Sequence, residues 1–213
     1  MKKHKKTIIF SCLTIAVLVV LLTGGMFSKY KESVELGSAN VTVTSAKLAD
    51  KFTLQEHGVV RQEDGSYKID EKEVVYSNSY TALPGDTLPK DPYITIEKDT
   101  KVEAYLYVEV ISPQNSKISY TMDGHWKLLS GITGAKGGTV YVYTGTGTDA
   151  LVLDEETGEL TVNILEGEQV TVAKGSDFSQ DVTLEFYGYL AQASAAGDAT
   201  AVYRTCFLGE GGN

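Results

Sequence analysis

The stretch "YITIEKDTKVEAYLYVEV", Tyr93 to Val110, decides the fold class of this chain. Its second half alternates with a period of two between small or aliphatic residues and charged or aromatic residues. The first set is Val102, Ala104, Leu106, Val108 and Val110, and the second set is Glu103, Tyr105, Tyr107 and Glu109. Alternation of this kind predicts a β-strand with two different faces. "DVTLEFYGYL", Asp181 to Leu190, repeats the pattern and predicts another strand.

Further short strands are predicted where β-branched and apolar residues gather between Gly, Asp, Asn and Ser turn residues. These segments are "NVTVT", "TVYVYT", "ALVLD", "LTVNIL" and "EQVTVA". Many short strands separated by frequent turns indicate an all-β fold, an antiparallel jelly-roll-like β-sandwich. Two other stretches give different expectations. "HWKLLSGI" (His125–Ile132) predicts a turn or two of helix, and the glycine-rich "SGITGAKGG" (Ser130–Gly138) predicts an exposed, flexible loop.

The connector "LPGDTLPKDP", Leu83 to Pro92, contains three of the four prolines in the chain. Proline fixes φ, lacks an N–H and favours extended geometry in the residue before it, so this segment is neither helical nor a central strand. We expect it to run along a sheet border. Pro84 and Gly85 suit the middle of a type II turn, and the predicted structural residues are Pro84, Gly85, Pro89, Asp91 and Pro92.

The N-terminus has the form of an export signal. "MKKHKK" is a basic region, and an uncharged apolar run follows it from Ile8 to Leu22. This run is short for a bilayer span, which needs about 20 apolar residues. We therefore expect residues 1–28 to be a signal peptide that is removed near Gly25 to Ser28. Residues 29–48 form an N-terminal arm, and residues 49–213 form one β-sandwich domain.

The net charge argues against a nucleic-acid partner, and the cysteine content argues against an intramolecular disulfide. Residues 1–28 contain four lysines and no acidic residue, so their removal changes the net charge from −9 to about −13. Such a chain repels phosphate backbones, and we expect no nucleic-acid partner. Cys206 is then the one remaining cysteine, so no intramolecular disulfide can form. In "AVYRTCFLG" it alternates with Val202 and Leu208, which predicts a small buried side chain on a strand.

No motif for catalysis or metal binding stands out. A zinc hydrolase needs about three ligands, and His57 and His125, the histidines that remain after cleavage, lie far apart in the sequence. "GITGAKGGT" lacks the adjacent Gly-Lys of a phosphate-binding loop. "DEETGE" lacks the alternating ligands of a calcium loop. We therefore expect no enzyme activity, no cofactor, and no catalytic or metal-binding residue, with both histidines in surface loops.

Several segments together resemble one family of secreted proteins. They are the basic, apolar leader ending in "GG", the arm "SANVTVTSAKL", "ALPGDTLPKDPYITIEKDTKVEAYLYVEV", "HWKLL", "VYVYT" and "FYGYLAQA". Together they resemble the TasA/camelysin family of Gram-positive proteins, whose signal peptides are of the type processed by the peptidase SipW. The resemblance implies that the lead-in before a jelly-roll core strand corresponds here to Pro84, Gly85, Lys90, Asp91 and Pro92.

The resemblance also implies a function. Family members are subunits of extracellular fibres in biofilm matrix, and camelysin has been described as a surface metalloprotease. We expect a secreted structural subunit, in the extracellular matrix or at the cell surface, whose partners are other copies of itself in a head-to-tail polymer, the signal peptidase and a minor accessory matrix protein. The alternatives are a camelysin-like surface metalloprotease and a monomeric adhesion module anchored in the membrane by a retained leader.

The arm is the segment through which such a subunit would assemble. Its apolar residues alternate in two registers on either side of Gly37-Ser38, so it predicts two short strands with a joint. The predicted assembly residues are Tyr30, Val34, Leu36, Val41, Val43 and Leu48. After cleavage the arm could complete the sheet of a neighbouring subunit by donor-strand exchange, which is the β-augmentation that the resemblance implies.

Overall fold

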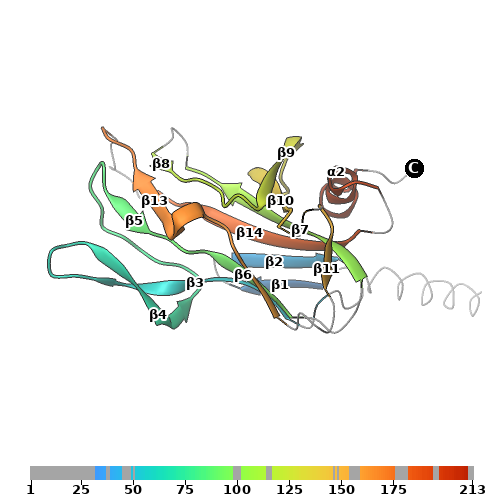
Figure 1. Cartoon of the computed structure of the whole chain (residues 1–213). Coiled ribbons are helices and arrows are strands. Elements are labelled where there is room, and N and C mark those ends of the chain that lie inside the picture. The colour runs from blue at the N-terminus through green and yellow to red at the C-terminus, as the bar shows by residue number, and fades with distance from the viewer. Residues whose placement is uncertain are drawn as a thin grey trace, which may run out of the picture.

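The computed structural model describes residues 32–36, 39–44, 49, 51–97, 102–113, 117–145, 147, 149–153, 159–175, 182–193 and 197–210. The predicted signal peptide lies outside the described residues, and so do Tyr30 and Leu48 of the arm. Within the described part, strands dominate and are arranged in three sheets (Figure 1). The prediction of an all-β sandwich is confirmed. The prediction of a jelly-roll strand order stays a prediction.

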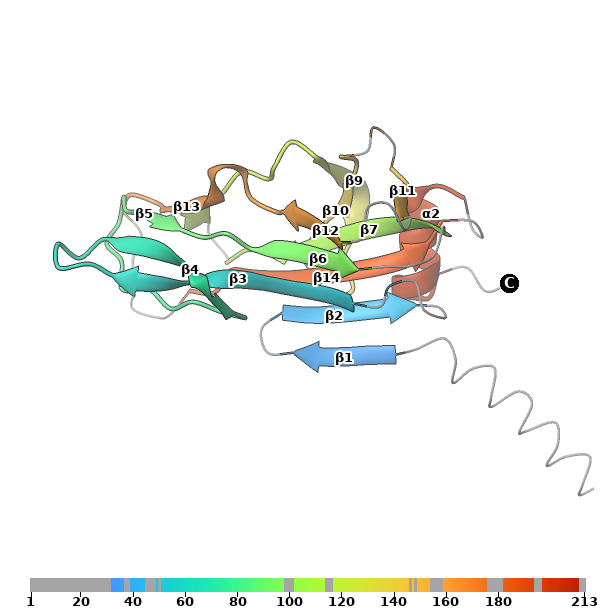
Figure 2. The same ribbon diagram turned by 60° about the horizontal axis from the view of Figure 1, so that its bottom comes forward.

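The largest sheet has seven strands. Their order is β1 (Glu32–Leu36), β2 (Ala39–Thr44), β14 (Glu185–Gln192), β7 (Val102–Ile111), β10 (Thr139–Tyr143) and β9 (Trp126–Thr133), and β11 (Leu151–Leu153) also pairs with β7. All pairs are antiparallel except β2 with β14, which is parallel. β1 therefore forms one border of this sheet, as Figure 2 shows, with β2 between it and β14.

Two smaller sheets complete the sandwich. The four-stranded sheet has the order β12 (Glu159–Asn163), β6 (Tyr93–Glu97), β3 (Lys51–Arg61) and β4 (Tyr67–Val75). The three-stranded sheet has the order β5 (Thr87–Pro89), β13 (Gln169–Val172) and β8 (Ile118–Ser119). A single 3-10 turn, η3 (Glu166–Glu168), joins β12 to β13. β3 and β4 are strands that the sequence analysis did not predict.

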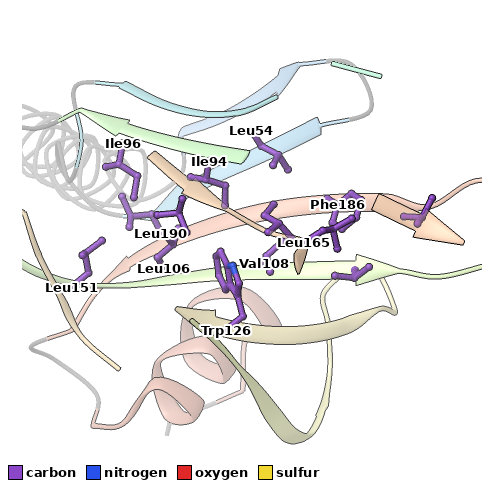
Figure 3. Close-up of a cluster of buried hydrophobic side chains, with 14 of the residues drawn as sticks. Leu54, Ile94, Ile96, Leu106, Val108, Trp126, Leu151, Leu165, Phe186 and Leu190 are labelled. Carbon is purple, nitrogen blue, oxygen red and sulfur yellow. The ribbon is translucent and has the colours of Figure 1, made fainter. Parts of the chain in front are cut away.

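The main core lies between the large sheet and the four-stranded sheet. Leu106 and Val108 of β7 and Leu190 of β14 point toward Ile94 and Ile96 of β6, and none of these side chains is more than 1% exposed (Figure 3). Burial of a side chain of this size contributes about 1.5 to 3 kcal/mol. The aliphatic face predicted for β7 is thus the face that closes the sandwich.

The opposite face of β7 is also buried. It is covered by the C-terminal helix α2 (Ala199–Tyr203) and the π-helical turn η4 (Arg204–Leu208). The hydroxyl of Tyr105 donates to the carbonyl oxygen of Gly197, and that of Tyr107 donates to the carbonyl oxygen of Ala199. The tyrosines of this face therefore anchor the C-terminal segment, since their rings pack against it and their hydroxyls bond to its backbone.

Two predictions about secondary structure are wrong. "HWKLLSGI" is not helical, because Trp126–Thr133 is strand β9, which pairs with β10. "AVYRTCFLG" is helical and not a strand, so Cys206 lies in η4 and is exposed instead of buried. The helix begins at a cap in which the Asp198 side chain accepts a hydrogen bond from the N–H of Ala201, a contact that favours helix over strand.

The connector lies where its prolines can be tolerated. β5, which ends at Pro89, is a border strand of the three-stranded sheet. The N–H of Asp86 donates to the carbonyl oxygen of Leu83, and Gly85 has φ +98°, which is the geometry of the predicted type II turn. Pro84 occupies a turn position whose N–H is not part of the turn bond, and Pro89 ends a border strand, so neither position requires a proline N–H group.

We expect the double substitution Pro89→Val and Pro92→Val to leave the fold intact and to increase aggregation. Pro89 ends the border strand β5, so valine there restores an N–H group and strand propensity at the border, which favours edge-to-edge pairing, whereas Pro92 is buried directly before β6. Far-UV circular dichroism and light scattering during incubation would check this. Global unfolding of the double variant would show instead that the prolines are required by the core.

Candidate functional site

Four polar residues join β3 to the connector, and we call them the clasp: Glu56, His57, Lys90 and Asp91. Lys90 Nζ lies 2.8 Å and 2.7 Å from the two carboxylate oxygens of Glu56, and their side chains are 12% and 4% exposed. His57 Nδ1 lies 2.6 Å from Asp91 Oδ2. Two adjacent residues on β3 thus pair with two adjacent residues of the connector: an acidic residue followed by histidine on β3, and lysine followed by an acidic residue on the connector.

The clasp continues the pairing of β3 with β6 beyond the end of the strand ladder. The ladder pairs Gln55 with Tyr93, and two residues further along β3 the backbone N–H of His57 donates to Asp91 Oδ1 at 3.2 Å. A side chain therefore takes the place of a backbone acceptor next to Pro92. Asp91 is the predicted connector residue whose side chain makes this bond. His57 lies on a strand, so its placement in a surface loop is wrong.

Asn78 binds the backbone of β3 on the edge that faces β4, next to His57. The register of β3 with β4 shifts between His57 and Gly58, so the two strands separate there. The Asn78 side chain accepts from the N–H of Val59 at 3.1 Å and donates to the carbonyl oxygen of His57 at 2.7 Å. It thereby satisfies backbone groups that β4 leaves unpaired.

A groove of about 690 Å³ opens beside the clasp. One wall is the uncharged segment 76–82, and part of the other wall is apolar. The apolar residues are Leu54, Leu88, Ile118, Val170, Val172, Val182, Leu184 and Phe186. Glu56 and Lys90 also line the groove. Tyr80 lies at its side, where burial, followed by the negative charges of Glu56 and Asp91, raises the pKa of its phenol well above the ordinary value.

A second polar centre is buried beneath the C-terminal helix. Glu109 of β7 is fully buried, and its carboxylate accepts from the backbone N–H groups of Lys136 and Gly138 at 2.9 Å and 2.7 Å. It also accepts from the hydroxyls of Tyr189 at 2.7 Å and Tyr203 at 3.3 Å. Three elements besides β7 therefore meet at one carboxyl group.

The glycine-rich loop has a different role from the one predicted. The residues of "GAKGG" form a tight turn in which the N–H of Gly134 donates to the carbonyl oxygen of Gly138 and the N–H of Gly137 donates to the carbonyl oxygen of Gly134, and this turn wraps around the Glu109 carboxylate. A Cβ atom at Gly134 would lie 2.2 Å from Glu109 Cδ. The loop does cradle an anion with its N–H groups, but the anion is the protein's own side chain.

The arm pairs with its own domain in this structure. β1 and β2 form a hairpin, and β2 lies parallel to β14 from Ala39 opposite Phe186 to Thr44 opposite Ala191. Of the predicted assembly residues, the strands contain Val34, Leu36, Val41 and Val43. The predicted joint at Gly37-Ser38 lies outside the described residues.

The described part of the chain holds no group of three His, Cys, Asp or Glu residues that could bind a metal. His125 Nδ1 is 2.6 Å from Asp123 Oδ1, so each described histidine has a carboxylate neighbour. No helix within the described ranges is long and apolar enough to cross a bilayer. Comparisons with protein-family models, curated proteins and solved structures find no match to this chain.

We expect Gly134→Ala to destabilise the fold by about 1 to 3 kcal/mol, because the added methyl group displaces a carboxylate held by several hydrogen bonds. Gly124→Ala is the matched control, since a Cβ atom there meets nothing within 4 Å and neither glycine has a positive φ. Urea unfolding of both variants would check this. Equal stability of the two variants would contradict the role of the turn.

We also expect stability to fall steeply above pH 10. Burial and then the hydrogen bond to Glu109 raise the pKa of Tyr189, and burial raises the pKa values of Tyr107 and Tyr203. A phenol with a raised pKa in the folded state stabilises the fold below its unfolded pKa of about 10, and this contribution is lost as the pH rises. In an alkaline titration, ionisation of Tyr107, Tyr189 and Tyr203, resolved from the other tyrosines by the phenylalanine variant of each, should therefore coincide with the loss of circular dichroism. Ionisation of these three phenols in a chain that stays folded would disprove this coupling.

Proposed function

We propose that the protein is a secreted structural subunit of extracellular fibres or biofilm matrix, that it assembles head-to-tail through its N-terminal arm, and that it has no catalytic activity. The resemblance to the TasA/camelysin family, the export signal and the acidic mature chain support this proposal. The structural observation that carries it is the position of the arm: a border hairpin whose inner strand pairs with β14.

A border hairpin of this kind can be exchanged between copies. Every backbone pair between β2 and β14 can form equally well when β2 comes from another subunit, so exchange preserves the interface and changes only the connectivity. If each subunit gives its arm to the next one, the contact is head-to-tail and propagates as a filament. The backbone pairs supply affinity, and the alternating side chains fix the register.

Neither alternative gains support from a specific contact. A surface metalloprotease needs a ligand cluster, and the histidines within the described ranges are each bonded to a single aspartate. A membrane-anchored adhesion module depends on a retained leader, whose residues lie outside the described part. N-terminal sequencing of secreted protein distinguishes the anchored module from the fibre subunit. A product that begins between Met26 and Tyr30 has lost the apolar leader and cannot be anchored by it.

Cross-linking tests the exchange directly. Asn40 lies opposite Tyr187 in the parallel pair. We would mix a mature chain carrying Asn40→Cys with one carrying Tyr187→Cys, both with Cys206→Ser, and oxidise the mixture after assembly. We expect a disulfide between the two chains on a non-reducing gel, because the arm of one copy pairs with β14 of another. A mixture of Asn40→Ser with Tyr187→Cys is the control.

Two results would contradict the proposal. One is a disulfide that forms only within a single chain carrying both cysteines and never in the mixture, since that arm stays in its own subunit. The other is fibre formation by a variant that begins at Ala49, which lacks the arm. We expect this variant to stay folded and monomeric in sedimentation and to form no fibres in electron micrographs.

A further inference from the structure

The groove beside the clasp is bordered by backbone groups that have no partner among the described residues. One such stretch is Val182 to Leu184, which precedes β14. The ladders of β14 begin at Glu185 with β7 and at Phe186 with β2, and no other backbone hydrogen bond within the described ranges reaches these three residues. The other stretch is Ser77 to Tyr80, whose backbone groups also bond to no described residue. Polar backbone groups beside an apolar groove are more stable when they are hydrogen-bonded.

Both stretches resemble strands that lack a neighbour. Neither contains a turn or a bend, and exposed and partly buried residues alternate along 77–82. Val182 and Leu184 are partly buried on either side of the exposed Thr183, in step with the buried Phe186. A period of two is that of extended chain with two faces. Each stretch therefore has the form that a guest strand needs for pairing.

The residues that line the groove have no net charge. Glu56 and Lys90 are the two charged residues of the lining, and they are paired with each other. Leu88, Val170 and Val172 of the three-stranded sheet contribute apolar surface. A charged occupant would lack a counter-charge there, and an anionic one would also be repelled by the acidic chain. The lining therefore favours an uncharged occupant with apolar groups.

We propose that this groove binds an extended, uncharged peptide segment of a partner protein, with an apolar residue at every second position, by strand addition to residues 182–184 and 77–80. The main chain of the peptide supplies hydrogen bonds to the unpaired backbone groups, and its alternate side chains pack against the apolar lining. At about 3.3 Å per residue, walls of this length match a guest strand of about four residues. The groove volume of about 690 Å³ lies within the range of pockets that hold a ligand.

Other occupants fit the groove less well. β2 pairs with β14 from Ala39 opposite Phe186 onward, so the arm of the same subunit does not extend along residues 182–184. An acyl chain has no donor or acceptor along its length and leaves the backbone groups of both walls unpaired. A sugar chain has hydroxyl groups, but it does not repeat the alternation of backbone and side chain that the two walls present.

Residue-resolved NMR of the mature chain, kept dilute, tests this assignment with a defined probe. The probe is the peptide acetyl-TVTVT-amide, and its isomer acetyl-TTTVV-amide has the same composition without the alternation. We expect the amide signals of residues 182–184 and 77–80 to shift with the alternating probe and to gain protection from hydrogen exchange. The isomer should shift them less, and the signals of β9 should stay unchanged with both peptides.

Two matched changes distinguish strand addition from simple apolar binding. Methylation of alternate amide nitrogens of the probe removes main-chain donors and should weaken binding at least about tenfold. Val182→Thr keeps the shape of a groove side chain but adds a hydroxyl, and it should weaken binding at least about threefold. Val60→Thr is the matched control, because Val60 is 48% exposed and lies outside the groove lining, so this variant should bind the probe as the wild type does.

Each contrary result overturns the proposal. Unshifted signals of residues 182–184 and 77–80 at millimolar probe would mean that the groove takes no strand. Equal binding of the alternating probe, its isomer and its methylated form would mean that apolar groups bind there without strand addition. Tighter binding of maltopentaose or laurate than of the probe would assign the groove to a sugar chain or an acyl chain. Shifts confined to β2 and β14 would mean that the probe replaces the arm and does not enter the groove.

Discussion

Glu109 must be buried, and the arrangement around β7 follows from that constraint. A carboxylate removed from water needs hydrogen bonds or a cation. Here the partners in the described part are two backbone N–H groups of the β9–β10 turn and hydroxyls from β14 and α2. One strand therefore dictates the path of a turn, the position of a neighbouring strand and the docking of the C-terminal helix. The same contacts seal the second face of the large sheet.

The alternation of aliphatic residues with charged or aromatic residues was sufficient to predict β7 and β14, because each strand places these two kinds of residue on opposite faces. It was insufficient for the C-terminal segment. Tyr105 and Tyr107 look like half-exposed strand residues, and their partners, Gly197 and Ala199, lie at the far end of the chain. Cys206 was misplaced for a related reason: a residue spacing that fits a strand also occurs in a helix, and the Asp198 cap decides between them.

The same limit applies to the clasp. The prolines predicted an extended border segment, and Asp91 was among the residues singled out. Nothing local in "EHGVV" indicates that Glu56 and His57 face Lys90 and Asp91, because their pairing depends on the register of β3 with β6. Asn78 was also missed, since an asparagine between serines has the composition of an ordinary loop. Charge order offered one signal: an acidic-basic pair on one segment and a basic-acidic pair on another.

The parallel pairing of β2 with β14 has a consequence for the order of folding. Thr42 pairs with Tyr189, so the first strands to be synthesised wait for nearly the last one. Contacts with such large sequence separation form late, because the intervening chain must be ordered first. β7 and β10, in contrast, are close in sequence and can pair early. During synthesis β2 can pair with β1 at once, and its pairing with β14 must wait until nearly the whole chain has been made.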